Sequence, residues 1–269
     1  MREGTKAVHK AAENSVFTKR FLRGQINRDE YGRYINSLYF VYNSMEGLLE
    51  KHKEHPTVKL IYFPTEVNHL EYYYGKDQVP DLIALDKMTP AVKEYVDAME
   101  SACAKNPALL IAHSYSRYLG DLSGGQILAK RLKTHIFHLS EKDAEWDTTE
   151  GLNFYHFEAI GNVPEFKEMY RERLNAAKVD APTRDLVVTE AVKSFQLNIA
   201  LFDEVEELSQ KHLLAPTLLR GEINVPEPAG LPKSHEKRSK KSWTIATSVA
   251  VAVAAVAVGA LIYKRVQKA

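Results

Sequence analysis

Cysteine is almost absent from this chain of 269 residues, since Cys103 is the only one. A single thiol can form neither an intramolecular disulfide nor a cysteine-rich metal site, which suits a reducing compartment. The N-terminus lacks the apolar stretch of a secretory signal, so we expect the body of the protein to stay in the cytosol. A surplus of charge is also missing, because 36 basic residues are interspersed with 35 acidic ones. This balance argues against nucleic acid as a partner.

Several motifs of nucleotide-binding proteins and hydrolases are missing too. There is no GxxxxGK loop and no GxGxxG after a strand, so no bound nucleotide is expected and a redox reaction would need electrons from another protein. GxSxG and HExxH are also absent. Glu66 and His69 have the ExxH spacing of di-iron ligands, but bundle enzymes of that kind use the motif twice. His135, His138 and Glu141 share a predicted helix face that we expect to be exposed and solvated.

Alternating strand patterns are lacking in residues 1–214, whereas helix signals recur. Asn27 and Glu30 have the spacing of a capping box, and apolar residues then keep to one side of a helix as far as Leu48. Three further helices are expected to begin at prolines: Pro90, Pro164 and Pro182. The sequence therefore predicts an all-α domain over residues 1–214.

The C-terminal part holds a long run without charge. Residues 242–263 contain no charged side chain, and a helix of that length spans the roughly 30 Å of a bilayer's hydrocarbon core. Trp243 and Tyr263 stand at its edges, with basic clusters on both sides, which is typical of a membrane span. We therefore predict a flexible, basic tether over 215–241, a transmembrane tail anchor over 242–263 and a short lumenal tail over 264–269.

Glycines interrupt a predicted helix within the stretch YSRYLGDLSGGQ. Gly120 and Gly124 are four residues apart and share a helix face, and Gly125 widens the bare strip. Each glycine costs about 1 kcal/mol in a helix interior, so the strip serves either close helix packing or a flat ligand that lies against the backbone. Asp121 beside the strip favours the ligand. The glycines also predict a kink in the helix.

Five stretches together closely resemble the eukaryotic haem oxygenases: TKAVHKAAEN, SLYFVY, AHSYSRYLGDLSGGQ, FKEMYRERLN and FQLNIALFDE. The resemblance extends from about Arg2 to about His212. It implies oxidative cleavage of haem to biliverdin, carbon monoxide and ferrous iron, with haem as both substrate and cofactor and O₂ as co-substrate. Electrons would come from an external NADPH-dependent flavoprotein reductase. Cys103 precedes alanine rather than proline, which favours the inducible type over the constitutive one.

The same resemblance assigns roles to individual residues. His9 is implied as the ligand of the haem iron, and Glu13 as the partner that orients it. Asp121 is implied to act through water on the distal side. Four residues are expected to complete that side: Gly120, Arg117, Tyr42 and Asn198. The remaining haem contacts are expected from Arg2, Tyr115, Gly124, Gly125, Lys167, Arg171 and Phe195, of which Lys167 and Arg171 would anchor the propionates.

The resemblance also suggests a location and partners. It implies the endoplasmic reticulum membrane, with the catalytic domain facing the cytosol and biliverdin reductase as a further candidate partner. The alanine- and valine-rich anchor leaves the mitochondrial outer membrane open. Two other functions also remain open, a non-catalytic haem carrier or sensor and a di-iron enzyme. His113 is expected to be a packed core histidine rather than a ligand.

Overall fold

The computed structural model describes residues 1–63, 71–75, 77–147, 151–157 and 160–217. These ranges contain helices and no strand, which confirms the predicted all-α class. The chain divides into two units by its internal contacts, and the larger comprises Met1–His156 with Asn162–Ile223. The smaller unit, Phe157–Gly161 with Asn224–Ala269, is described at only a few positions. The architecture below is that of the larger unit.

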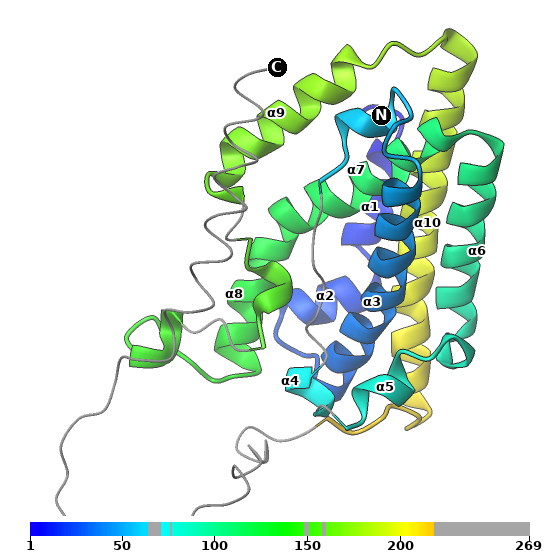
Figure 1. The fold of residues 1–269 in the computed structure, drawn as a ribbon. Coiled ribbons are helices and arrows are strands. Elements are labelled where there is room, and N and C mark those ends of the chain that lie inside the picture. Colours follow the sequence, from blue (N-terminus) through cyan, green and yellow to red (C-terminus); the bar gives the residue numbers. More distant parts are fainter. Residues whose placement is uncertain (64–70, 76, 148–150, 158–159, 218–269) are drawn as a thin grey trace, which may run out of the picture. The chain divides into compact units, whose positions relative to one another are not determined.

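Most of the described residues lie in α-helices (Figure 1). Their bounds are α1 Lys6–Glu13, α2 Val16–Leu22, α3 Arg28–Lys51, α4 Glu71–Tyr74, α5 Val79–Leu82, α6 Pro90–Lys105, α7 Leu110–Gly120, α8 Gln126–His135, α9 Val163–Ala176 and α10 Ala181–Gln210. Short 3₁₀ turns occur between several of them. The predicted ExxH motif, the anchor over 242–263 and the tail over 264–269 lie outside the described residues, as does most of the tether. Within the described ranges, no helix combines the length and the apolar character that a bilayer crossing requires.

The helix starts follow from local sequence. Asn27 and Glu30 form the predicted capping box at the start of α3, each side chain accepting from the other's backbone N–H. The prolines expected to open helices stand in the first turns of α6, α9 and α10. Asp180 also caps α10 by accepting from the backbone N–H of Thr183 at 2.8 Å.

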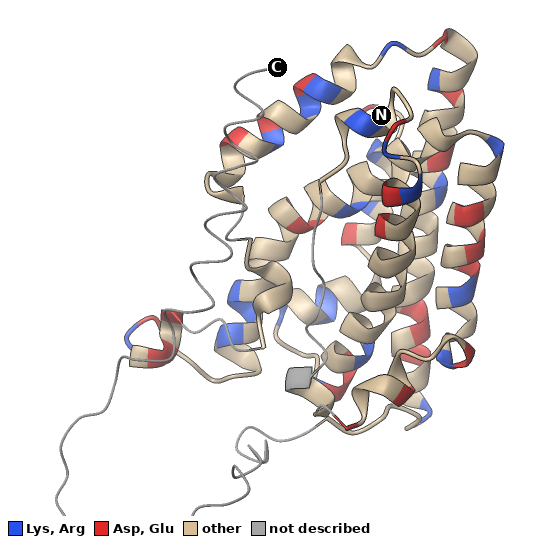
Figure 2. Cartoon of the chain, in the orientation of Figure 1, with Lys and Arg blue, Asp and Glu red and all other residues tan. Residues whose placement is uncertain are grey.

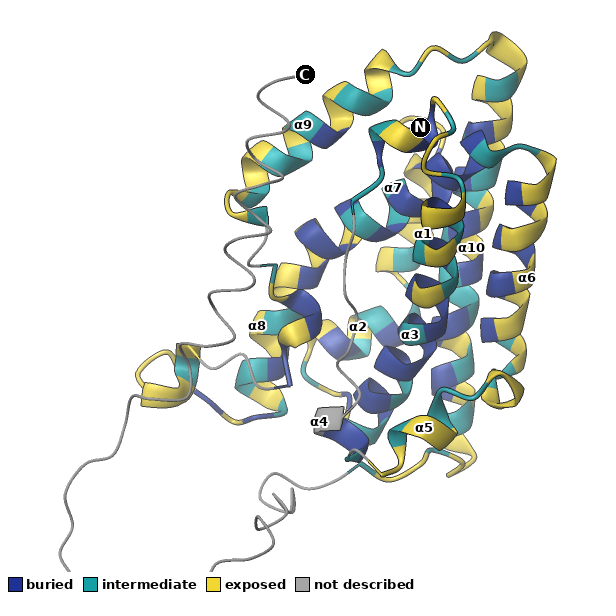
Figure 3. Ribbon diagram, viewed as in Figure 1, coloured by how far each residue is buried: buried dark blue, intermediate teal, exposed yellow. Residues whose placement is uncertain are grey.

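The core forms around the long helix α10. At 30 residues α10 is about 45 Å long, and it packs against α1, α2, α3, α6 and α7. Helix α3 buries the predicted stripe from Tyr31 to Met45, but Leu48 is only half-buried and Leu49 is buried in its place. Figure 3 shows the contrast between these buried faces and the exposed residues of α1, which has no buried residue.

An ion cluster ties three of the helices together at their ends. Nη1 of Arg20 in α2 lies 2.8 Å from a carboxylate oxygen of Glu30 in α3 and 2.7 Å from one of Glu206 in α10. Glu30 is fully buried and also accepts a hydrogen bond from Ser209. Elsewhere charges of both signs are interspersed along the surface helices, as Figure 2 shows for α9.

The glycine stretch produces the predicted kink. Asp121–Gly125 forms a π-helical turn between α7 and α8, and Figure 1 shows the chain changing direction there. A π turn inserts an extra residue into the helix and is frequent at functional sites. It directs Asp121 and the glycines towards the pocket described next.

Candidate functional site

A pocket of about 210 Å³ lies where α1, α2, α3, α7, α8 and α10 meet around the π-helical turn. Eight of the predicted site residues line it: Glu13, Arg117, Gly120, Asp121, Gly124, Gly125, Phe195 and Asn198. Apolar side chains form much of the remaining wall, including Ala12, Leu22, Ile127, Leu128 and Phe202. Residues that are far apart in the sequence therefore converge on a mostly apolar site with a few polar groups, as expected for a ligand pocket.

The three glycines divide between the two roles considered for them. A Cβ atom placed on Gly120 or Gly124 would meet nothing within 4 Å, so their backbone faces open space. A Cβ on Gly125 would lie 2.9 Å from ring atoms of Tyr155, which is too close. Gly120 and Gly124 therefore leave room for a ligand, whereas Gly125 permits close packing of a side chain against the helix.

Beside this bare backbone, Asp121 is held by two side chains. Nη2 of Arg117 donates to both carboxylate oxygens at 3.0 Å, and the hydroxyl of Tyr42 donates to one of them. Nη1 of Arg117 donates to the amide oxygen of Asn198. The structure thus assembles the predicted distal residues into one cluster. Arg117 thereby supplies a hydrogen-bond partner to Asn198, whose neighbours Phe195 and Phe202 on α10 are apolar.

Burial and electrostatic interactions keep Tyr42 and Arg117 each in one protonation state. Burial and then the charge of Asp121 raise the pKa of Tyr42 well above its usual value. Burial lowers the pKa of Arg117. Its electrostatic interactions with Asp121 and then with nearby phenol groups outweigh this effect, so that the pKa of Arg117 is raised well above its usual value. Tyr42 therefore remains a neutral donor and Arg117 a cation. Three donated hydrogen bonds leave Asp121 roughly one more acceptor position, which suits a pocket water.

His9 lies on α1 beside the pocket, although only its neighbours Ala12 and Glu13 are among the lining residues. Its side chain is 54% exposed, and its Nδ1 lies 3.5 Å from Oε1 of Glu13. The edge of its ring meets Phe195 at a centroid distance of 5.4 Å. A proton on Nδ1 directed at Glu13 leaves the lone pair of Nε2 free to bind a metal. This geometry agrees with the predicted pair of ligand and orienting carboxylate, whose roles stay predictions.

The predicted propionate contacts are more scattered. Nζ of Lys167 lies 3.4 Å from the hydroxyl of Ser123 in the π turn, which brings α9 next to the glycines. Arg171 pairs instead with Glu168 on its own helix at 3.2 Å. Tyr115 is half-buried on α7, and Arg2 is exposed near the N-terminus. None of these predicted contacts is among the residues that line the pocket, so their roles stay predictions.

The other histidines are placed as structural or surface groups. His113 is fully buried, with Nε2 3.1 Å from Oε1 of Glu190, which agrees with a packed core histidine. His135 and His138 are exposed, as expected. The prediction that they share a helix face was wrong, because α8 ends at His135 and His138 adopts a left-handed backbone with φ of 55°. The described ranges hold no group of three or more metal-binding side chains.

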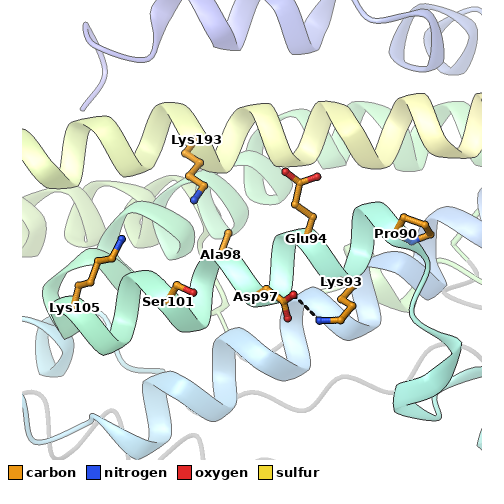
Figure 4. A pocket seen from close by; sticks show the side chains of 8 residues that line it. All are labelled: Pro90, Lys93, Glu94, Asp97, Ala98, Ser101, Lys105 and Lys193. Atoms are coloured by element: carbon orange, nitrogen blue, oxygen red, sulfur yellow. Dashed lines mark hydrogen bonds and ion pairs between the residues drawn. The ribbon is translucent and has the colours of Figure 1, made fainter.

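A larger hollow of about 560 Å³ lies elsewhere, along the surface between α6 and α10 (Figure 4). Charged side chains stand along it, including Lys105, Lys193 and the ion pair of Lys93 with Asp97 at 2.5 Å. It contains no predicted site residue and no bare backbone. We therefore assign the function to the smaller pocket, where the glycines and the buried Asp121 cluster meet.

Several lining residues were not predicted as functional from the sequence. They include Thr18, Leu22, Tyr34, Ser116 and Ser194. From its sequence position, Tyr34 is expected only as a residue of the buried stripe of α3. The sequence holds no signal that could have identified it, because a tyrosine in a buried stripe is ordinary.

Comparison with known proteins gives consistent matches to one family. The protein-family model described as "Heme oxygenase" matches residues 1–204. "Heme oxygenase 1" of Gallus gallus is 37% identical over 219 residues, covering 78% of this chain and 70% of the relative. The Homo sapiens "Heme oxygenase 1" is 34% identical and covers 97% of this chain and 94% of the relative. "Heme oxygenase 2" of Rattus norvegicus is 36% identical, and the match spans 77% of this chain and 64% of that protein.

Solved structures give the same result. The crystal structure of heme oxygenase-1 from the cyanobacterium Synechocystis in complex with heme has a TM-score of 0.68 at 38% identity, covering 79% of this chain and 93% of that one. The structure of a heme oxygenase from Leptospira interrogans has a TM-score of 0.65 at 36% identity, covering 76% and 96%. Because type 1 and type 2 relatives match at similar identity, the inducible type stays a prediction.

Proposed function

The chain belongs to the haem oxygenase family, and from this premise we propose that it cleaves haem to biliverdin, carbon monoxide and ferrous iron with O₂ and external electrons. One observation supports this most strongly. The open backbone of Gly120 and Gly124 lies in the same pocket as the buried Asp121 cluster. The open backbone gives a flat macrocycle a surface to lie against. The Asp121 cluster gives the reaction on the face of that macrocycle a set of fixed polar groups.

The residues present fit haem on both sides. His9, oriented by Glu13, would hold the iron through Nε2. The bare backbone of Gly120 and Gly124 would cover the opposite face, since a Cβ at either position would otherwise fill that space. Bound haem supplies the redox-active iron and also the ring that is opened. Lys167 and Arg171 of α9 are the cations proposed to hold the propionates, with Tyr115 and Arg2 as further contacts.

On the distal side, the chain's own groups control hydrogen bonding and protons. Asp121 is fixed by Arg117 and Tyr42, so its carboxylate cannot turn away from the pocket. It is proposed to hold a water there and so to deliver a proton through that water rather than directly. Because the groups are already oriented, they need no rearrangement during the reaction, which is the main advantage of preorganised electrostatics.

The test is an aerobic turnover assay on the full-length protein with haem and a chemical reductant. Loss of the haem absorption band with formation of biliverdin would support the proposal. A haem complex that stays stable under these conditions would identify a haem carrier or sensor instead. Failure to bind haem at all would leave the di-iron enzyme as the alternative.

The electron donor is proposed to be an NADPH-dependent flavoprotein reductase of the endoplasmic reticulum. The family supports an external electron donor in general, because haem oxygenation consumes electrons and the sequence carries no nucleotide-binding motif. Biliverdin reductase is a further candidate partner, since it would consume the product. Reconstitution with purified reductase and NADPH tests the first partner, and turnover that occurs only with a chemical reductant would contradict it.

We also propose that residues 242–263 anchor the protein in the endoplasmic reticulum membrane with the catalytic domain in the cytosol. The uncharged run, its aromatic edges and its basic flanks support this. Deleting residues 242–269 should release a haem-competent protein from the membrane fraction. It should also lower turnover with membrane-bound reductase more than turnover with a soluble reductant, because the two proteins lose their shared surface. Retention of the shortened chain in membranes would show that the span is misassigned.

A further inference from the structure

Tyr34 is a pocket residue that the roles above leave unused. It lies on α3 and lines the same pocket as Arg117 and Asp121. Tyr42, two helix turns further along α3, donates to Asp121. The eight-residue spacing puts the two phenols about 80° apart around the axis of α3, so Tyr34 reaches a different part of the cluster, where it can serve the other half of the ion pair, Arg117.

The ring of Tyr34 is held in one orientation. It is 3% exposed, and its centroid lies 5.3 Å from that of Phe17 in α2 and 5.5 Å from that of Phe202 in α10. Those two phenylalanine rings stack on each other at 5.3 Å. Because aromatic side chains enclose the ring from two helices, the hydroxyl at its tip has a fixed position in the pocket wall.

The titratable groups around Tyr34 keep it neutral. Burial raises the pKa of Tyr34 to about 12, although the nearby charge of Arg117 acts in the opposite direction. Asp121 and the phenols of Tyr95 and Tyr155 are the other titratable groups that interact with it. A neutral phenol whose oxygen accepts from Arg117 still has its own hydrogen to donate.

Arg117 has donors to spare for such a contact. A guanidinium carries five N–H groups, and here Nη1 serves Asn198 while Nη2 serves Asp121. Its Nε is buried and has no hydrogen-bond partner. A phenol oxygen can accept from this cation without adding a negative charge, so it does not compete with Asp121 for the ion pair.

We propose that Tyr34 is a further distal residue of the haem pocket, whose hydroxyl accepts from Arg117 and donates its own hydrogen into the pocket. This inference rests on the proposed haem site. Asp121, held by the hydroxyl of Tyr42, would then provide an acceptor in the distal pocket, and Tyr34 would provide a donor. A fixed donor stabilises negative charge at the place to which it points.

The test compares Tyr34→Phe with a matched control, Tyr170→Phe. The first removes the hydroxyl and keeps a ring that suits its aromatic surroundings. The second removes a buried hydroxyl outside the pocket lining, which donates to Ser114 at 2.8 Å. Each full-length protein is loaded with ferric haem, and its visible spectrum is followed with pH, since the spectrum changes where a distal solvent molecule loses a proton. Losing a donor disfavours the negative form, so Tyr34→Phe should raise the midpoint by about 0.5 to 1 pH unit and Tyr170→Phe should leave it unchanged.

A second substitution keeps the test independent of any loss of folding. Incorporation of 3-fluorotyrosine at Tyr34 retains the hydroxyl and makes it a stronger donor, so the midpoint should fall. A Tyr34→Phe protein that binds haem normally and has an unshifted or lowered midpoint would overturn the role of Tyr34 alone. A wild-type protein that binds no haem would overturn the proposed function itself.

Discussion

Gly124→Ala separates the ligand from the packing explanation of the glycine strip. In the structure, a Cβ atom at this position would meet nothing within 4 Å. Alanine is favoured over glycine in a helix by about 0.5 to 1 kcal/mol, so the ligand-free protein should become more stable by about that amount. The new methyl group would nevertheless occupy the side of the helix proposed to cover the haem. A tenfold loss of haem affinity would correspond to about 1.4 kcal/mol.

Two other glycine-to-alanine substitutions serve as controls for Gly124→Ala. Gly125→Ala would place a Cβ 2.9 Å from the ring of the buried Tyr155, and such overpacking costs about 1 to 3 kcal/mol. That variant should lose stability. Gly47→Ala on α3 also meets nothing within 4 Å and lies outside the pocket lining, so it should gain stability as Gly124→Ala does but keep haem affinity.

The assays are urea unfolding of each ligand-free protein and haem titration by absorbance. Higher stability combined with weaker haem binding in Gly124→Ala alone would be the signature of a ligand face. If Gly124→Ala lowered the free energy of unfolding, the glycine would serve helix packing. If it bound haem as tightly as the wild type, this face of the turn would not be the haem face, and the reasoning would fail.

Four further substitutions test other parts of the structure. His9→Ala should abolish turnover and recover part of it with added imidazole, whereas unchanged iron coordination in its spectrum would defeat the assignment. Asp121→Ala should leave haem affinity nearly intact but shift the outcome from biliverdin to peroxidase-like oxidation of an added phenol, and a normal biliverdin yield would make Asp121 structural. Arg20→Ala leaves Glu30 buried without its cation and should lower the free energy of unfolding by about 3 kcal/mol in urea, so an unchanged value would show that the cluster adds nothing. For Glu190, burial raises the pKa, but a hydrogen bond and charges outweigh it, and the pKa falls below its usual 4.5. Its contribution to stability is therefore present above about pH 4.5 and lost as the pH falls through the lower folded-state value, so Glu190→Gln should flatten the acid-side fall of the melting temperature.

Much of the fold could be predicted because its signals are local. A capping box involves two residues three apart, and a proline in a first turn requires only its own geometry. The kink at Gly120 and Gly124 is likewise a property of adjacent residues. The end of α8 was missed because His138 adopts a left-handed backbone that nothing in its own residue type announces. Helix ends are less well specified than helix starts when no glycine marks them.

The site could be predicted only where a residue was unusual for its surroundings. Asp121 beside glycines stood out, and the structure joins it through Arg117 to Asn198, which only the resemblance had indicated. Tyr34 did not stand out, because a tyrosine in a buried stripe is ordinary. Its position in the pocket depends on α2 and α10 enclosing its ring and on Arg117 arriving from α7, which are long-range contacts. A polar group that looks like core in the sequence becomes a candidate site residue once packing places it in the same pocket wall as a buried ion pair.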